Sequence, residues 1–184
     1  ELKPALTGVF FQTTEKGIVA VSTDGHRLVK HFRTDHQKNN ISGGVVVPKK
    51  FLTYLSTHLK EDSVDLVLAE THLAAKVGLD VVLTRIIDEK FPNYESVIPK
   101  NNDKKFVVDK ESLLGAIKRV SIFSNKSTHQ IALSLGPGGC KIKTEDPEKS
   151  SKAQESLSVD YNGDDLTIGY NAEYLKDVVS HIST

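Results

Sequence analysis

An internal repeat constrains the fold of this chain more than any other feature of its sequence. Three stretches share one layout, in which a short apolar segment leads directly into a helical pattern: VVVPKKFLTYL, FVVDKESLLGAI and TIGYNAEYLKDVV. The junctions lie at Pro48, at Asp109 61 residues later, and at Asn171 a further 62 residues on. Proline preorganises a first helical turn, and Asp and Asn are favourable N-cap residues. The spacing predicts an internal duplication, with accidental spacing of ordinary α+β elements as the alternative.

Each of the three predicted helices carries an apolar face. The residues four positions after the junctions are Leu52, Leu113 and Leu175. The residues seven positions after the junctions are Leu55, Ala116 and Val178. Positions four and seven lie on one side of a helix, so we expect these side chains to face a core.

Alternating apolar and polar residues follow the first two helices. The alternating segments are 64–68, 73–77, 79–86, 131–135, 140–144 and 157–161. Residues 5–33 supply three further strands, and alternation of this kind indicates sheets with one buried face. The repeating unit is therefore predicted to be strand, helix, strand, strand, strand, in an α+β fold. We expect two domains, 1–98 without its first strand and helix and 103–184 without its last strands.

Composition excludes several function classes. Lys plus Arg and Asp plus Glu both number 24, so no overall charge favours nucleic acid or a membrane surface, and any such role needs local clustering. A single cysteine, Cys140, rules out an intrachain disulfide framework and fits a reducing compartment. No apolar run is long enough to span a bilayer. Methionine is absent, so we expect that Glu1 is not the natural start.

The sequence offers little support for catalysis, a cofactor or a metal. Its seven histidines form no metal-ligand motif, and GPGG at 136–139 is a predicted turn between strands rather than a phosphate loop. Asp24 beside His26 could serve as the acid–base pair of a hydrolase. The Asp-Gly step is already explained by turn geometry, because glycine tolerates the positive φ that a hairpin turn needs.

Two segments carry more polar or apolar residues than a turn or linker requires. The predicted hairpin tip STDGHRL gathers Thr23, His26 and Arg27 around Asp-Gly. The turn-rich segment KFPNYESVIP holds five apolar or aromatic residues, Phe91, Pro92, Tyr94, Val97 and Ile98. These residues must pack onto something, either as a linker held against its own domain or as the wall of a ligand groove.

Basic residues recur on the predicted helices. Those of interest are Lys49, Lys50, Lys110, Lys118 and Arg119. Phosphate contacts need cations and carry no sequence information, so equivalent helices could present one basic surface to duplex DNA. A solvated helix face is the simpler interpretation of any single lysine.

The chain resembles the bacterial sliding clamp family, the beta subunit of DNA polymerase III. The resemblance is carried by TGVFFQTTEKGIVAVSTDGHRLV, VVVPKKFL, DEKFPNYESVIPK, SIFSN and IGYNAEYLKDVV, in that order, and covers essentially the whole chain. It implies a clamp fold of repeated β-α-β-β-β units, with antiparallel sheets outside and helices lining the inner surface. The chain would be most of the central domain and the first part of the C-terminal domain.

The resemblance also implies functional residues. A hydrophobic cleft for short linear motifs of the polymerase catalytic subunit, the clamp loader and repair proteins would comprise Leu6, Thr23, Gly25, His26, Arg27, Leu28, Pro92, Val97, Asn171 and Tyr174. Ile122 and Phe123 match an apolar pair at the interface that closes a homodimeric ring. The implied function is a non-catalytic processivity factor of a DNA-directed DNA polymerase in the bacterial cytoplasm, which encircles duplex DNA of any sequence. The alternatives are a peptide-docking adaptor that does not encircle DNA and a hydrolase using Asp24 and His26.

Overall fold

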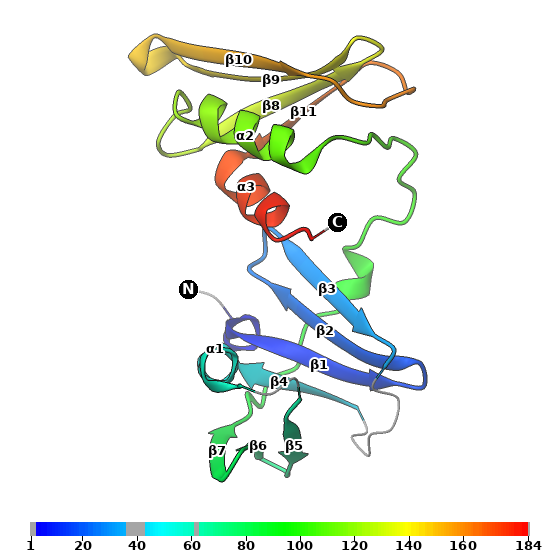
Figure 1. Ribbon diagram of the computed structural model, residues 1–184, viewed down its shortest axis with the longest axis vertical. Coiled ribbons are helices and arrows are strands. Elements are labelled where there is room, and N and C mark those ends of the chain that lie inside the picture. The colour runs from blue at the N-terminus through cyan, green and yellow to red at the C-terminus, as the bar shows by residue number, and fades with distance from the viewer. Residues whose placement is uncertain (1–2, 36–42, 61–62, 184) are drawn as a thin grey trace. The chain divides into compact units, whose positions relative to one another are not determined.

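The computed structural model describes residues 3–35, 43–60 and 63–183. The chain divides into two compact units, Glu1–Pro99 and Lys100–Thr184, here called unit 1 and unit 2 (Figure 1). Both units combine antiparallel sheets with α-helices, which confirms the predicted α+β class. No helix in the described part of the chain is both long and apolar enough to cross a bilayer.

Unit 1 begins with a four-stranded sheet. After a 3-10 turn at Pro4–Thr7, the strands are β1 (Gly8–Thr14), β2 (Gly17–Thr23), β3 (Leu28–Arg33) and β4 (Gly44–Pro48). Their order is β3-β2-β1-β4, with every neighbouring pair antiparallel, so β3 is an edge strand. The three strands predicted between residues 5 and 33 are therefore present.

The second half of unit 1 consists of α1 (Lys49–His58) and a three-stranded sheet. The strands β5 (Asp65–Leu68), β6 (His72–Val77) and β7 (Asp80–Arg85) pair in the order β5-β6-β7. Phe51 and Leu55 of α1 pack with Leu73 and Ala75 of β6 in one buried cluster. A short 3-10 turn, η2 (Tyr94–Ser96), follows in the segment that was predicted to be a linker.

Unit 2 is built from two helices and one sheet. It contains α2 (Lys110–Ser121), β8 (Gln130–Gly136), β9 (Gly139–Asp146), a 3-10 turn η3 (Pro147–Lys149), β10 (Ser151–Leu157), β11 (Leu166–Asn171) and α3 (Ala172–Ser180). The strands form one antiparallel sheet in the order β10-β9-β8-β11. Gly136 pairs with Gly139, so GPGG is the predicted strand-to-strand turn.

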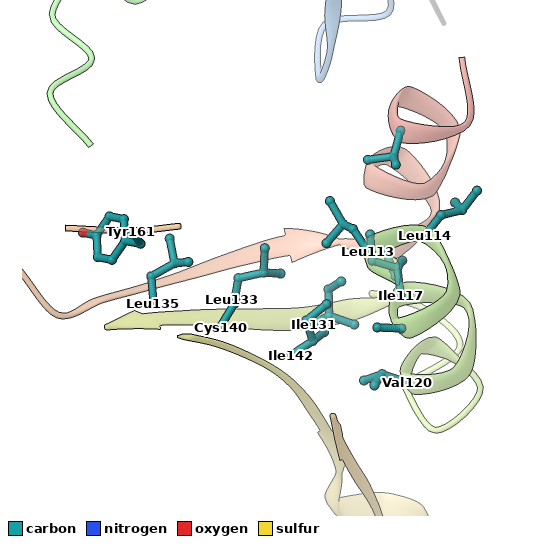
Figure 2. Packing of buried hydrophobic residues seen from close by; sticks show 13 residues of the cluster. Leu113, Leu114, Ile117, Val120, Ile131, Leu133, Leu135, Cys140, Ile142 and Tyr161 are labelled. Atoms are coloured by element: carbon teal, nitrogen blue, oxygen red, sulfur yellow. The ribbon is translucent and has the colours of Figure 1, made fainter. Parts of the chain in front are cut away.

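The core of unit 2 lies between its sheet and its helices. Figure 2 shows Leu113, Ile117 and Val120 of α2 pointing toward the strands that carry Ile131 and Ile142. Burial alternates along β9, where Cys140, Ile142 and Thr144 are buried and their neighbours are exposed or half-buried. One face of the sheet therefore supplies the core and the other faces solvent.

The helix junctions agree with the sequence prediction. Pro48, Asp109 and Asn171 are the N-cap residues of α1, α2 and α3. The Asp109 carboxylate accepts a hydrogen bond from the Ser112 backbone N–H, and Asn171 Oδ1 accepts two from the first turn of α3. Pro48 offers no such side-chain acceptor, because a proline ring can only fix φ.

Three local predictions were wrong. No strand precedes α2, because Val107 forms only an isolated bridge with Asp160. The third strand of unit 2 is Ser151–Leu157 rather than 157–161, because β9 begins at Gly139 and the antiparallel pairing therefore stops where Leu157 lies opposite Cys140. Val178 was predicted to face the core, but it is exposed and Val179 is buried instead. The face of α3 that packs against α2 and the sheet is therefore shifted by one residue from the predicted face.

Candidate functional site

The hairpin tip between β2 and β3 is organised by Asp24. Its Oδ1 accepts hydrogen bonds from the backbone N–H groups of His26 and Arg27, each at 3.0 Å. Its Oδ2 accepts one from Arg27 Nε at 2.9 Å. Gly25 has a φ of +89°, a conformation that strains residues with a Cβ. The polar residues thus hold the backbone of a four-residue loop, and Asp24 needs no acid–base role to account for its position.

These contacts also fix the charge of Asp24. Burial raises the pKa of its carboxyl group, but hydrogen bonds from the Arg27 and His26 backbone and from the Arg27 guanidinium outweigh burial. The net result lowers the pKa of Asp24 to about 2. The tip therefore keeps its Asp24–Arg27 ion pair throughout the physiological pH range.

Thr23 closes the base of the tip. Its hydroxyl donates to the Arg27 carbonyl at 2.7 Å and accepts from the Gly25 backbone N–H at 3.1 Å. The register then pairs Thr23 with Leu28, the first residue of β3. Leu28 consequently lies on the same face of the sheet as Thr23, directly beside the tip.

The segment after β7 packs onto this face of the first sheet. The ring of Phe91 stacks on Phe10 of β1, with centroids 5.0 Å apart and an interplanar angle of 10°. Tyr94 Oη donates a hydrogen bond to Gln12 Oε1 at 3.2 Å. Phe91 is buried with Val19 and Val21 of β2, which shows why this segment is rich in aromatic residues.

The tip and this segment together border an open cavity of about 710 Å³, here called the groove. The structure brings together all the predicted cleft residues that belong to unit 1, namely Leu6, Thr23, Gly25, His26, Arg27, Leu28, Pro92 and Val97. Apolar side chains form most of the surface, and the tip adds hydrogen-bonding groups at one side. Such a groove suits a peptide whose apolar side chain enters the cavity while polar contacts hold its backbone.

Several further residues of the groove were not predicted. They are Lys30, Asn93, Tyr94, Ile98 and Pro99. The sequence predicts that Tyr94 and Ile98 pack onto another surface, but it does not assign them to the cleft. Lys30 could have been found from the two-residue period of β3, because it follows Leu28 on the same face.

Lys30 connects β3 to the segment that covers the sheet. Its ammonium group donates a hydrogen bond to Glu95 Oε1 and lies 5.4 Å from the centroid of the Tyr94 ring. The Glu95 hydrogen bond is the main cause that raises the pKa of Lys30. Lys30 therefore stays charged and holds η2 near the edge strand.

Asn171 and Tyr174, the two remaining predicted cleft residues, belong to unit 2. Asn171 caps α3 and its Nδ2 donates to the Thr128 carbonyl at 3.2 Å. The backbone N–H of Tyr174 donates to the Asn171 side chain at 3.3 Å. The start of α3 is thus tied to the loop that ends at His129, whose φ of +49° is unusual for a residue with a side chain.

The predicted DNA-facing residues differ in what their side chains contact. Lys49 and Lys50 are exposed in the first turn of α1, and Lys118 is exposed on α2. The Lys110 ammonium instead donates to the Ile182 carbonyl, and Nε and Nη2 of Arg119 both donate to the Glu155 carboxylate. Lys49, Lys50 and Lys118 are therefore better suited to phosphate contacts than the other two.

Ile122 and Phe123 follow α2 and are exposed to 66% and 45%. Ser151 Oγ of β10 donates to the Phe123 carbonyl at 3.2 Å and fixes the backbone at this point. Two adjacent apolar side chains on a fixed backbone form a small patch of the kind found in protein interfaces.

Comparison with known families covers both units. Residues 1–93 match the central domain of the DNA polymerase III beta subunit, and residues 95–184 match its C-terminal domain. The beta sliding clamp of Pseudomonas putida is 37% identical over 181 residues, which are 97% of this chain and 49% of that protein. The chain thus spans about half the length of the curated relatives it matches.

Solved structures give the same result. A DNA polymerase sliding clamp from Pseudomonas aeruginosa superposes with a TM-score of 0.94 at 34% identity, covering 100% of this chain and 51% of that one. A sliding clamp from the same organism bound to griselimycin has a TM-score of 0.86 at 35% identity, covering 98% of this chain and 49% of that one. The antiparallel sheets and helices described above are therefore those of a known fold.

Proposed function

This chain belongs to the DNA polymerase III beta subunit family, the bacterial sliding clamps, and from that membership we propose that it is part of a replication processivity factor. Residues 1–98 form the central clamp domain and residues 103–184 the C-terminal clamp domain. The whole protein encloses duplex DNA in a homodimeric ring in the bacterial cytoplasm. It tethers the polymerase by enclosing the duplex, so it needs no catalytic residue, metal or cofactor of its own.

The groove is the docking site for partner proteins in this proposal, and its geometry is the observation that carries it. Leu6, Leu28 and Pro92 come from three distant parts of unit 1 and line one open, mainly apolar cavity. A leucine or phenylalanine of a short linear motif fits between such walls, and a buried anchor of this kind dominates the affinity of an interface. The partners are the polymerase catalytic subunit, the clamp loader and repair proteins.

The polar tip serves to orient the peptide rather than to react with it. Gly25 leaves room for a close backbone approach, since nothing lies within 4 Å of the place a Cβ would occupy. His26 and Arg27 border the groove and carry donors for peptide carbonyls or a carboxylate. The family resemblance adds Asn171 and Tyr174 of unit 2 to the residues proposed for docking.

A fluorescent peptide with a Leu-Phe pair tests the groove. We expect Leu28→Ala to weaken its binding about tenfold, the effect of losing part of an apolar anchor pocket. Val29→Ala is the matched control, because Val29 lies on the opposite face of the same strand and is 59% exposed. Equal binding by the Leu28→Ala variant and the wild type would refute the assignment.

The DNA contact is tested in the full-length protein. Lys49→Glu combined with Lys50→Glu should weaken retention on duplex DNA and lower the salt dependence, because each lost phosphate contact reduces the number of released counterions by about one. Arg119→Gln should have a smaller effect, since Glu155 already binds that guanidinium. A protein that keeps peptide binding but shows no affinity for DNA at low salt would instead be a docking adaptor.

A further inference from the structure

A second cavity lies on the same face of the first sheet as the groove. It has a volume of about 580 Å³ and is lined by Thr14, Glu15, Lys16, Val19, Lys30 and Phe32, and we call it the side cavity. Lys30 lines both cavities. The two spaces are therefore neighbours, and Lys30 stands at the point where one meets the other.

The floor of the side cavity is apolar. Val19 of β2 is 6% exposed, and its cross-strand partner Phe32 on β3 is 45% exposed. A large aromatic residue on an edge strand risks association with other chains, and natural edges usually carry charged residues instead. Aromatic residues, phenylalanine included, are enriched in protein interfaces relative to the rest of the surface.

The spacing along β3 connects the two cavities. Leu28, Lys30 and Phe32 follow one another with a period of two, so they share one face of the strand. At a rise of about 3.3 Å per residue, Leu28 and Phe32 lie about 13 Å apart. An extended peptide covers the same distance in about four residues, so a peptide anchored beside Leu28 reaches Phe32 four residues from its anchor.

Two ammonium groups, those of Lys16 and Lys30, line the side cavity together with the carboxylate of Glu15. The ammonium group of Lys16 makes no hydrogen bond or ion pair with the residues that the structure describes, whereas Lys30 is bound to Glu95. A carboxylate that enters the side cavity beside Lys30 is attracted by both lysines that line this cavity, and it competes with Glu95 for Lys30.

We propose that the side cavity binds the continuation of the peptide that docks in the groove. The matching segment carries an aromatic side chain four residues from the groove anchor, which packs on Val19 and Phe32. An acidic residue midway between them pairs with Lys16 and Lys30. This inference rests on the proposed function of the groove, and it adds a length and charge requirement that selects among docking partners.

Fluorescein-labelled synthetic peptides test the proposal on the 184-residue chain by fluorescence anisotropy. The short peptide holds only the Leu-Phe pair between serines. Two long peptides add an Asp and a Phe, as Leu-Phe-Ser-Asp-Ser-Phe and Phe-Ser-Asp-Ser-Leu-Phe, because the bound segment can run in either direction along β3. A peptide of equal length with an all-serine extension controls for length. At least one long peptide should bind about tenfold more tightly than the short one.

Variants of the protein locate the source of that gain. Phe32→Ser and Lys16→Glu should each remove most of it and leave the affinity for the short peptide unchanged. Leu28→Ala should weaken both peptides. His31→Ser is the matched control for Phe32→Ser, since His31 is exposed on the opposite face of the same strand, and it should change neither affinity.

The outcomes separate this inference from the groove itself. If the wild type binds the short peptide and neither long peptide gains, the side cavity has no such role and the groove assignment stands. A Phe32→Ser variant that weakens the short and long peptides equally also overturns the inference. If the wild type binds no peptide at all, both the docking groove and its extension are refuted.

Discussion

The two units are built from the same kinds of element, α-helices and antiparallel sheets, but they bury different parts of their sheets. In unit 2, β9 alternates strictly between buried and exposed residues, and one continuous cluster from α2, α3 and the sheet forms the core. In unit 1, Val45, Val46 and Val47 of β4 are all buried, because the strand is covered on both faces. Val45 and Val47 belong to one cluster and Val46 to another.

The second cluster of unit 1 exists because a chain segment, rather than a helix, covers that face. Phe91 fills it by stacking on Phe10, and the segment around it forms one wall of the groove. A binding groove thus arises where the covering layer is thin and irregular. The buried apolar residues of unit 2 form a single core, and the solvent-facing surface of its sheet is polar. We therefore expect substitutions in the core of unit 2 to affect stability alone. Substitutions in the second cluster of unit 1 should affect both stability and docking.

The largest expected effect is a loss of packing in the single core of unit 2. Ile142 is fully buried in it, so Ile142→Ala should lower the free energy of unfolding by about 3 to 4 kcal/mol. Native-state hydrogen exchange should report lost protection in β8 and β9, while β1 and β2 keep theirs and the groove still binds peptide. Equal loss of protection in both units would mean that their cores do not respond separately.

A smaller effect on stability should accompany a direct effect on docking in unit 1. Phe91→Leu keeps an apolar side chain but loses the ring stack on Phe10, which should cost about 1 to 2 kcal/mol. Because Phe91 holds the wall of the groove, peptide affinity measured by anisotropy should fall as well.

The matched control for Phe91→Leu is Phe11→Leu. Phe11 lies next to Phe10 on β1 but packs against the other cluster of unit 1. The two substitutions should cost similar stability in thermal unfolding, and Phe11→Leu should leave peptide binding intact. If both reduce binding to the same extent, the groove depends on the stability of unit 1 as a whole.

Local chemistry made part of this architecture predictable from the sequence. The helix junctions and the hairpin tip were recognised because a cap or a turn depends on a few adjacent residues, such as Asp109 with Ser112 or Asp24 with Arg27. The repeat itself gave the order of the elements. The residues proposed for the groove came from the family resemblance, since no local pattern relates Leu28 to Pro92.

What escaped prediction depends on register and on contacts between distant residues. The strand β10 lacks the alternation of large apolar residues that would have predicted it. Its inward positions include Ser151, Ala153 and Glu155. Glu155 tolerates an inward position since Arg119 of α2 pairs with it. Lys30 joins the groove only because Tyr94 and Glu95 fold back over β3. All of these contacts join residues that are distant in the sequence, so no local pattern predicts them.

A comparison of helix starts gives a smaller effect. Asn171 caps α3 with its side chain, so Asn171→Ala should lower the free energy of unfolding of unit 2 by about 1 kcal/mol. Pro48→Ala at the start of α1 removes no side-chain cap and should change the stability of unit 1 by only a few tenths of a kcal/mol. Urea denaturation measures both. A larger loss for Pro48→Ala would contradict the assigned caps.

The smallest expected effect concerns the charge of the hairpin tip. Because the pKa of Asp24 is lowered to about 2, its ionised form is favoured in the folded state, and the tip gains stability above its unfolded pKa near 3.8. That contribution should disappear as the pH falls from about 4 to 2. Carbon-13 NMR should place the Asp24 midpoint near 2, and Arg27→Ala should raise it, because the guanidinium is lost and only the two backbone N–H donors then oppose the effect of burial. A wild-type midpoint near 3.8 would mean that Asp24 does not hold the tip in place. The groove beside the tip would then have no fixed polar side.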